Sequence, residues 1–279
     1  MNSTEILQVA TDHGAARLLI DRASGSPRAV LALGHGAGGG PDALDLAILA
    51  ERLPAYGIEV VRMEQPWRLA GKRIAPRPAV LDQAWCQALG TLSERSRSVE
   101  PSESSGPPGI SRPDNVTGVV PPLIVGGRSA GARVACRTAG ELDAIGCLSL
   151  AFPLHPPGRA DDPDKDRSPE LVGAGLPTLV LQGERDPFGE PDAVRDRVAA
   201  AGPAPGRGSR PSSRGSSSRG HGRQTSGIRV VPVPQAGHEL TVSKRATITQ
   251  SEVLELITAS AAEWIEELIG GQVEGSDRK

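Results

Sequence analysis

The sequence feature that most constrains the fold is the pentapeptide Gly127-Arg-Ser-Ala-Gly131, which stands between two contrasting patterns. The preceding run, residues 122–126, is short and aliphatic and predicts a buried strand, whereas residues 129–142 predict a helix. Small residues around Ser129 permit the strained turn that would expose its hydroxyl group. In a chain with 34 glycines the pentapeptide alone carries little weight. The order of strand, sharp turn and helix is what indicates a nucleophile elbow.

The rest of the chain alternates between strand and helix patterns after an opening hairpin, predicted at residues 6–10 and 16–20. Further strands are predicted at residues 29–33, 58–63, 144–152, 178–182 and 228–233. Helices are predicted at residues 42–56, 79–94, 192–201 and 249–269. This order predicts an α/β protein with a mainly parallel sheet, an antiparallel entrance and helices on both faces.

Two segments interrupt this pattern, residues 96–121 and 202–227. Both are rich in Ser, Pro and Gly, so we expect flexible inserts in a single domain that spans residues 1–279. The second insert has five Arg and no acidic residue, which also allows a basic tether for an acidic partner or a site of Ser modification. Residues 153–175 are too few for a large cap, so we expect an open site.

Composition excludes several classes of function. A net charge of −2 gives no reason to expect binding to nucleic acid or to an anionic membrane. The three cysteines lie in apolar stretches, which favours reduced, buried thiols, and no cluster has the spacing of metal ligands. No signal-peptide pattern and no apolar run of about 18 residues is present, so we expect a cytoplasmic protein.

A carboxylate and a histidine follow later strands, in the order that a Ser–acid–His triad requires. Asp186 comes after the strand at 178–182, with Glu184 as the competing carboxylate. His238 lies between the last strand and the last helix, whereas His13 and His221 are expected to be incidental. An acid in this place would orient the imidazole of His238 for proton transfer with Ser129.

An oxyanion hole would need two N–H donors. The backbone amide of Ala130 is one candidate, and the glycine-rich loop after residues 29–33 offers Ala37, with Gly38 as a second choice. The loop lacks the sequence frame of a phosphate-binding loop, and its His35 is expected to order the loop rather than to catalyse.

Several motifs together resemble a family of small predicted α/β-hydrolases related to the dienelactone hydrolases and to the hydrolase-like domain of a histone-acetyltransferase scaffold subunit. They are Gly126–Arg133, Phe152–Gly158, Gly183–Gly189, His35–Gly38 and Pro66–Arg68. The resemblance covers nearly the whole chain except the inserts and implies the α/β-hydrolase fold and the triad named above. The chain departs from such elbows at Ala130 and Ala132, where Met or Gly and Gly are common.

These patterns predict a serine hydrolase that cleaves a small-molecule ester or other acyl substrate through an acyl-enzyme, with no cofactor and no metal. Five residues are candidates for substrate binding: Gly36, Gly38, Trp67, Arg128 and His155. Arg128 and Arg133 would either attract an anionic substrate or face solvent and neighbouring helices. The alternatives are a catalytically silent hydrolase-like binding or scaffold protein and, less favoured, a nucleotide-binding protein. The substrate and the oligomeric state stay open.

Overall fold

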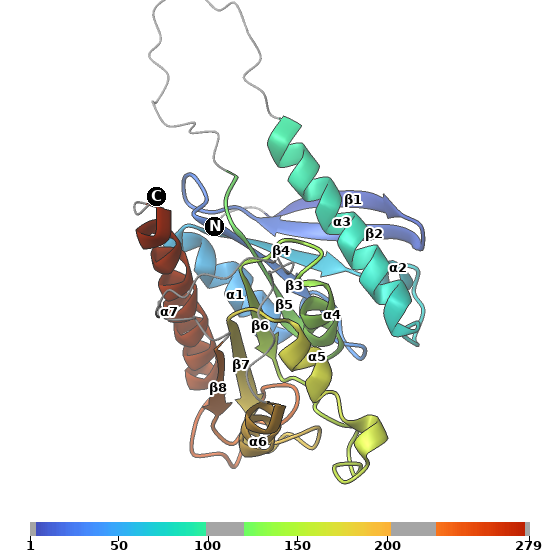
Figure 1. The fold of residues 1–279 in the computed structure, drawn as a ribbon, viewed down its shortest axis with the longest axis vertical. Helices are drawn as coiled ribbons and strands as arrows, with labels where there is room; N and C mark the ends of the chain where they lie inside the picture. Colours follow the sequence, from blue (N-terminus) through green and yellow to red (C-terminus); the bar gives the residue numbers. More distant parts are fainter. Residues whose placement is uncertain (1–3, 99–119, 202–226, 277–279) are drawn as a thin grey trace, which may run out of the picture.

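The structure is a computed structural model and describes residues 4–98, 120–201 and 227–276 (Figure 1). The two segments expected to be flexible inserts lie outside the described residues except at their ends. Residues 96–98, expected to begin the first insert, belong instead to the end of helix α3, Pro78–Ser98.

The strands form one eight-stranded sheet in the order β1-β2-β4-β3-β5-β6-β7-β8. Their bounds are β1 Glu5–Thr11, β2 Gly14–Asp21, β3 Ala29–Gly34, β4 Ile58–Glu64, β5 Leu123–Arg128, β6 Gly146–Leu150, β7 Thr178–Gly183 and β8 Ile228–Val233. The β1–β2 and β2–β4 pairs are antiparallel, and the remaining pairs are parallel. The predicted fold class is therefore confirmed.

Helices cover both faces of the sheet, and Figure 1 shows α7 and α3 on opposite sides of it. The helices are α1 Leu44–Arg52, η1 Leu53–Tyr56, α2 Pro66–Leu69, α3 Pro78–Ser98, α4 Ala130–Thr138, η2 Pro163–Lys165, α5 Ser168–Gly173, α6 Pro191–Ala201 and α7 Gln250–Ser276. One apolar core lies between the sheet and α3 to α6, and the second lies between the sheet, α1 and α7. Burial on both faces explains why most strands are continuous apolar runs.

Several predicted elements have different ends in the structure. The helix predicted at 42–56 is α1 followed by the 3₁₀ turn η1, because Pro54 has no N–H to continue the α-helical ladder. The helix predicted at 129–142 ends at Thr138, and the chain then turns through Asp143, whose φ is +51°. The strand predicted at 144–152 is shorter, Gly146–Leu150. The short helices α2 and α5 were not predicted, since neither is long enough to show a helical period.

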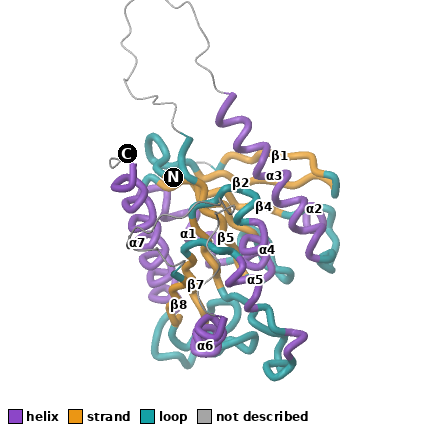
Figure 2. Tube along the Cα trace, viewed as in Figure 1, coloured by secondary structure: helices purple, strands orange, loops and turns teal. Residues whose placement is uncertain are grey.

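The parallel strands end at one edge of the sheet, and the loops that follow them carry the predicted site residues. Figure 2 shows these loops between the strands and the helices that cover them. Crossover connections in a parallel sheet place successive strand ends on the same edge, which is where α/β proteins hold their ligands. The site is therefore assembled from segments that lie far apart in the sequence.

Candidate active site

Ser129 occupies a strained turn between β5 and α4. Its φ of +53° and ψ of −110° lie in a region that side chains other than glycine rarely adopt. The turn passes very close to the end of β3: a Cβ atom at Gly131 would lie 2.1 Å from the carbonyl oxygen of Gly34, and one at Gly127 would lie 2.5 Å from it. Glycine is required at both positions because any side chain would displace that strand end.

Ser129 is hydrogen-bonded to a histidine that a carboxylate holds from the other side. The Oγ atom of Ser129 lies 2.8 Å from Nε2 of His238, and Nδ1 of His238 lies 2.8 Å from Oδ2 and 3.0 Å from Oδ1 of Asp186. A carboxylate can only accept here, so Nδ1 carries the proton and Nε2 is free to accept from the serine hydroxyl. The structure thus brings together the three residues predicted as the triad.

The carboxyl group of Asp186 is almost completely buried, with 2% of the residue exposed. Gln182 Nε2 donates to Oδ2 at 2.9 Å and the backbone N–H of Phe188 donates to Oδ1 at 2.8 Å, so both oxygens are fixed. The competing carboxylate of Glu184 accepts instead from the backbone N–H of Gln235. Hydrogen bonding therefore distinguishes Asp186 from Glu184 as the partner of His238.

The glycine-rich loop after β3 lies beside the elbow. A Cβ atom at Gly36 would lie 3.5 Å from Cβ of Ser129, and Ala37 and Ala130 line the same small space. As the first residue of α4, Ala130 has an N–H without an intrahelical acceptor. The structure therefore brings Ala37 and Ala130, the two predicted oxyanion donors, to the same side of the serine. Gly38, the second choice, has open space around it: a Cβ atom there would meet nothing within 4 Å.

His35 joins this loop to the turn that follows β4. Its Nδ1 lies 2.8 Å from the carbonyl oxygen of Gly36, and its Nε2 lies 3.2 Å from the backbone N of Gln65. A carbonyl only accepts and an amide only donates, so the ring is the neutral Nδ1–H tautomer. Burial lowers the pKa of His35, which favours this neutral form. These contacts agree with the predicted role of His35 in ordering the loop.

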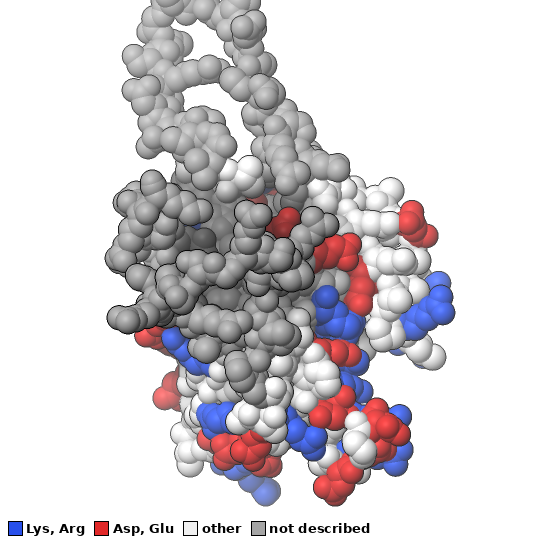
Figure 3. All heavy atoms as spheres, in the orientation of Figure 1, with Lys and Arg blue, Asp and Glu red and all other residues white. Residues whose placement is uncertain are grey.

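Arg128, a predicted substrate-binding residue, is buried. Its Nε donates to Oδ2 of Asp45 at 3.0 Å, and its Nη2 donates to the backbone carbonyl of His238 at 2.9 Å. Arg133 forms an ion pair with Glu170 on α5, in keeping with the helix-packing alternative. Figure 3 shows acidic and basic side chains intermixed over this part of the surface, around α5 and α6.

Comparison with known proteins places the chain in a family. Residues 27–202 match the model of a family described as an alpha/beta hydrolase domain. The chain belongs to the alpha/beta hydrolases. No curated protein gives a significant match to the sequence.

Solved structures share the fold at low sequence identity. A Xanthomonas campestris protein, described as a serine hydrolase without a lid, is 18% identical with a TM-score of 0.55, covering 95% of this chain and 96% of that one. Est1E from Butyrivibrio proteoclasticus is 13% identical with a TM-score of 0.62, covering 95% and 99%. Dienelactone hydrolase from Anabaena variabilis is 15% identical with a TM-score of 0.60, covering 95% and 97%. At these identities the likeness shows the fold alone.

Two other predicted substrate-binding residues of the hydrolase lie near this edge of the sheet. Trp67, with 6% exposed, lines a cavity of about 380 Å³ and also the small space beside Ala37. His155 is half-buried in the loop after β6, where its backbone N–H donates to the carbonyl oxygen of Phe188. His13 also lines the cavity and bonds to Gln83, and His221 lies outside the described residues.

Within the described parts of the hydrolase, no group of three or more His, Cys, Asp or Glu side chains is arranged to hold a metal ion. Cys136 and Cys147 are buried and Cys86 is half-buried, all as free thiols. Over the same residues, no helix has the length and apolar character that crossing a membrane requires.

Three residues of the site were missed by sequence reasoning. The ring of Phe188 stacks on that of His238 with centroids 4.1 Å apart, Gln182 fixes the carboxylate of Asp186, and Asp45 pairs with Arg128. Phe188 lies within the motif Gly183–Gly189 and Gln182 directly precedes it, which was a usable signal. Asp45 had no such signal, because it is 83 residues away from its partner.

Proposed function

We propose that this hydrolase cleaves an ester or another acyl compound by acyl-enzyme catalysis, with Ser129 as the nucleophile. The observation that carries the proposal is the unbroken line of hydrogen bonds from Ser129 Oγ through His238 to Asp186, with distances of 2.8 Å on both sides of the imidazole. Such a line is the arrangement by which a histidine activates a serine hydroxyl.

In the first half of the reaction Ser129 attacks the substrate carbonyl carbon while His238 Nε2 takes the hydroxyl proton. The resulting imidazolium gives that proton to the leaving group as the carbonyl re-forms. In the second half a water molecule attacks the acyl-enzyme, again with His238 as base, and the acid product leaves with Ser129 restored. Asp186 stays ionised and holds the imidazole in the Nδ1–H form.

Backbone amides of Ala130 and Ala37 stabilise the negative charge that develops on the carbonyl oxygen. Support comes from the position of Ala130 at the start of α4, where the helix dipole favours negative charge, and from the place of Ala37 beside it. Phe188 covers one face of the His238 ring and restricts its rotation. The imidazole of His238 is therefore held in position before the substrate binds.

The substrate is expected to be small or presented at a surface, since the described residues form no large cap over this edge of the sheet. Est1E, which shares the fold, has been solved with ferulic acid bound, so the fold accommodates a compact aromatic acid. That likeness supports an ester as the first substrate class to test. The thioester, amide and peptide alternatives use the same groups and differ in the shape of the pocket.

A fluorophosphonate probe tests the proposal, because only an activated serine reacts with it. We expect labelling of the wild-type protein at Ser129, hydrolysis of p-nitrophenyl esters, and neither reaction in the Ser129→Ala variant. A folded wild-type protein that resists the probe and hydrolyses no ester would favour the catalytically silent binding protein instead.

A further inference from the structure

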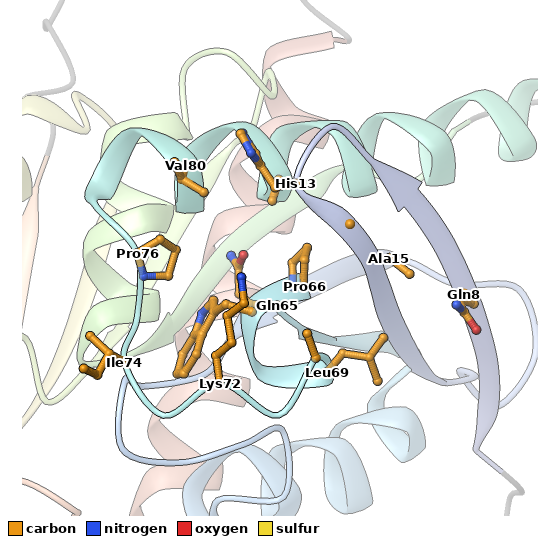
Figure 4. Close-up of a pocket in the computed structure, with 14 residues that line it drawn as sticks. Gln8, His13, Ala15, Gln65, Pro66, Leu69, Lys72, Ile74, Pro76 and Val80 are labelled. Atoms are coloured by element: carbon orange, nitrogen blue, oxygen red, sulfur yellow. The ribbon is translucent and has the colours of Figure 1, made fainter.

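A cavity of about 380 Å³ lies next to the proposed catalytic site. It is enclosed by α2 and the turn before it, by the tip of the β1–β2 hairpin and by the first turns of α3 (Figure 4). Gln65 and Trp67 form the wall that it shares with the small space beside Ala37 and Ala130. Gln65 and Trp67 therefore stand between the cavity and the proposed oxyanion hole.

The sheet order sets the distance between the cavity and the serine. Ser129 follows β5, the near wall of the cavity at Gln65 and Trp67 follows β4, and β3 lies between these two strands; the β1–β2 hairpin lines the far side. Neighbouring strands are 4.7–4.9 Å apart, so two steps across the sheet amount to about 10 Å. An acyl chain with its carbonyl carbon at Ser129 would have to be about this long to reach the near wall of the cavity.

The lining is mainly apolar. Its apolar side chains include Trp67, Leu69, Ile74, Pro76 and Val80. Ile74 is 85% exposed, so it lies at the rim of the cavity. Such a surface suits a compact hydrocarbon or aromatic group.

Lys72 is the one Lys, Arg, Asp or Glu side chain among the described residues that line the cavity. Residues 65–81 contain four basic residues and no acidic one. The basic residues are Arg68, Lys72, Arg73 and Arg77. Lys72 lines the cavity, and none of the four forms an ion pair with another described residue. Arg128 and Arg133, by contrast, are already paired. The positive potential here is therefore free to act on a ligand.

We propose that this cavity binds the part of the substrate remote from the scissile bond, and that this part is a compact apolar group ending in a carboxylate or similar anion. The proposal rests on the proposed serine hydrolase activity. Lys72 pairs with the anionic group at the mouth, while Trp67 and Val80 hold the hydrocarbon. Specificity for acidic acyl esters comes from this side of the site rather than from Arg128.

Two esters with the same acyl chain test the assignment: mono-p-nitrophenyl suberate and its neutral methyl ester, with p-nitrophenyl acetate as the short reference. We expect the wild-type protein to favour the anionic ester, chiefly through a lower KM. Lys72→Glu should lower the anionic-to-neutral ratio of kcat/KM by about tenfold, the scale expected for reversing one exposed charge. Lys165→Glu makes the same charge change on the exposed turn η2, outside the cavity, and should leave the ratio unchanged.

Filling the cavity gives a second readout that is independent of charge. Val80→Trp should lower kcat/KM more for both suberate esters than for acetate. One outcome would overturn this proposal alone: the protein is labelled at Ser129 and hydrolyses p-nitrophenyl acetate, but its anionic-to-neutral ratio of kcat/KM is close to one and does not change in Lys72→Glu. The proposed function would then still stand. Absence of both labelling and hydrolysis overturns the proposed function, and the cavity assignment with it.

Discussion

Arg128 donates from Nη2 to the backbone carbonyl of His238 at 2.9 Å, so the residue before the nucleophile holds the loop that carries the base. Arg128→Lys keeps the charge but cannot hold both Asp45 and the His238 carbonyl with one compact ammonium group. A hydrogen bond to a charged group is worth about 1.5–3 kcal/mol, so kcat should fall by about 10- to 100-fold. Steady-state kinetics should show KM nearly unchanged, whereas a rise in KM alone would indicate substrate binding by Arg128.

The same arginine is predicted to matter for stability. Arg128 and Asp45 are both buried, so Arg128→Met leaves a carboxylate without its partner and should cost about 3–5 kcal/mol in the free energy of unfolding. The double variant with Asp45→Asn should recover much of this loss, because no uncompensated charge remains. Urea denaturation of the wild type, both single variants and the double variant measures the coupling energy between Arg128 and Asp45. Losses of unfolding free energy that simply add would contradict a stabilising interaction between the two side chains.

Removing members of the triad should reduce turnover without unfolding the protein. Ser129→Ala should lower kcat by about a millionfold, as expected when three groups act as a unit. Asp186→Asn should lower it by about ten-thousandfold, because an amide at this position favours the wrong imidazole tautomer. Ester hydrolysis with active-site titration measures both changes, and circular dichroism checks the fold. Comparable activity in Ser129→Ala would remove this serine from the mechanism.

The sequence predicts most of the sheet and the meeting of the three triad residues, because both depend on local patterns. Each strand is a short aliphatic run, and a parallel sheet brings the ends of β5, β7 and β8 to one edge. Chain order alone then places Ser129 in a glycine-flanked turn and His238 after the last strand. No packing detail is needed to expect their approach.

Contacts across the fold could not be predicted in this way. Whether Arg128 faces a substrate or a buried carboxylate depends on where α1 packs. The sequence around Asp45 does not indicate that this residue will contact Arg128. The cavity beside Trp67 is likewise formed by the β1–β2 hairpin, α2 and α3, which are separate in the chain. The α2 helix itself spans only Pro66–Leu69, too short to produce a periodic pattern.

Gly131 lies so close to the carbonyl group of Gly34 that adding a single methyl group at residue 131 is expected to destabilise the protein. A Cβ atom there would approach the carbonyl oxygen to 2.1 Å, so Gly131→Ala must displace either α4 or the end of β3. We expect a loss of about 1–3 kcal/mol in the free energy of unfolding, as for other overpacked sites, together with a lower kcat.

Gly270→Ala is the matched control, because Gly270 lies in α7 with open space around its Cβ position. There the substitution should stabilise the protein by about 0.5–1 kcal/mol through helix propensity. Thermal and urea unfolding of the two variants should therefore move in opposite directions. Equal stability of Gly131→Ala and the wild type would contradict the close approach of β3 to the elbow.

The buried imidazole of His35 predicts a specific dependence of stability on pH. Its pKa is lowered in the folded protein by burial, whereas in the unfolded chain it titrates near its ordinary value of about 6.5. Below that pH the unfolded state binds more protons than the folded state, so His35 makes the free energy of unfolding fall as the pH drops. The contribution is fully present above about pH 6.5 and is lost progressively as the pH falls toward the folded pKa.

His35→Asn tests this dependence, because its amide can still donate to the carbonyl oxygen of Gly36 but does not titrate. The two proteins are otherwise identical, so the informative quantity is the difference between their free energies of unfolding, measured in urea from pH 7.5 down to the acid limit of folding. The difference should narrow steadily as the pH falls, because only the wild type loses the neutral ring. A difference that stays constant across the range would mean that the loop tolerates a charged His35, and that the bond from Gln65 N–H to Nε2 does not hold the ring neutral.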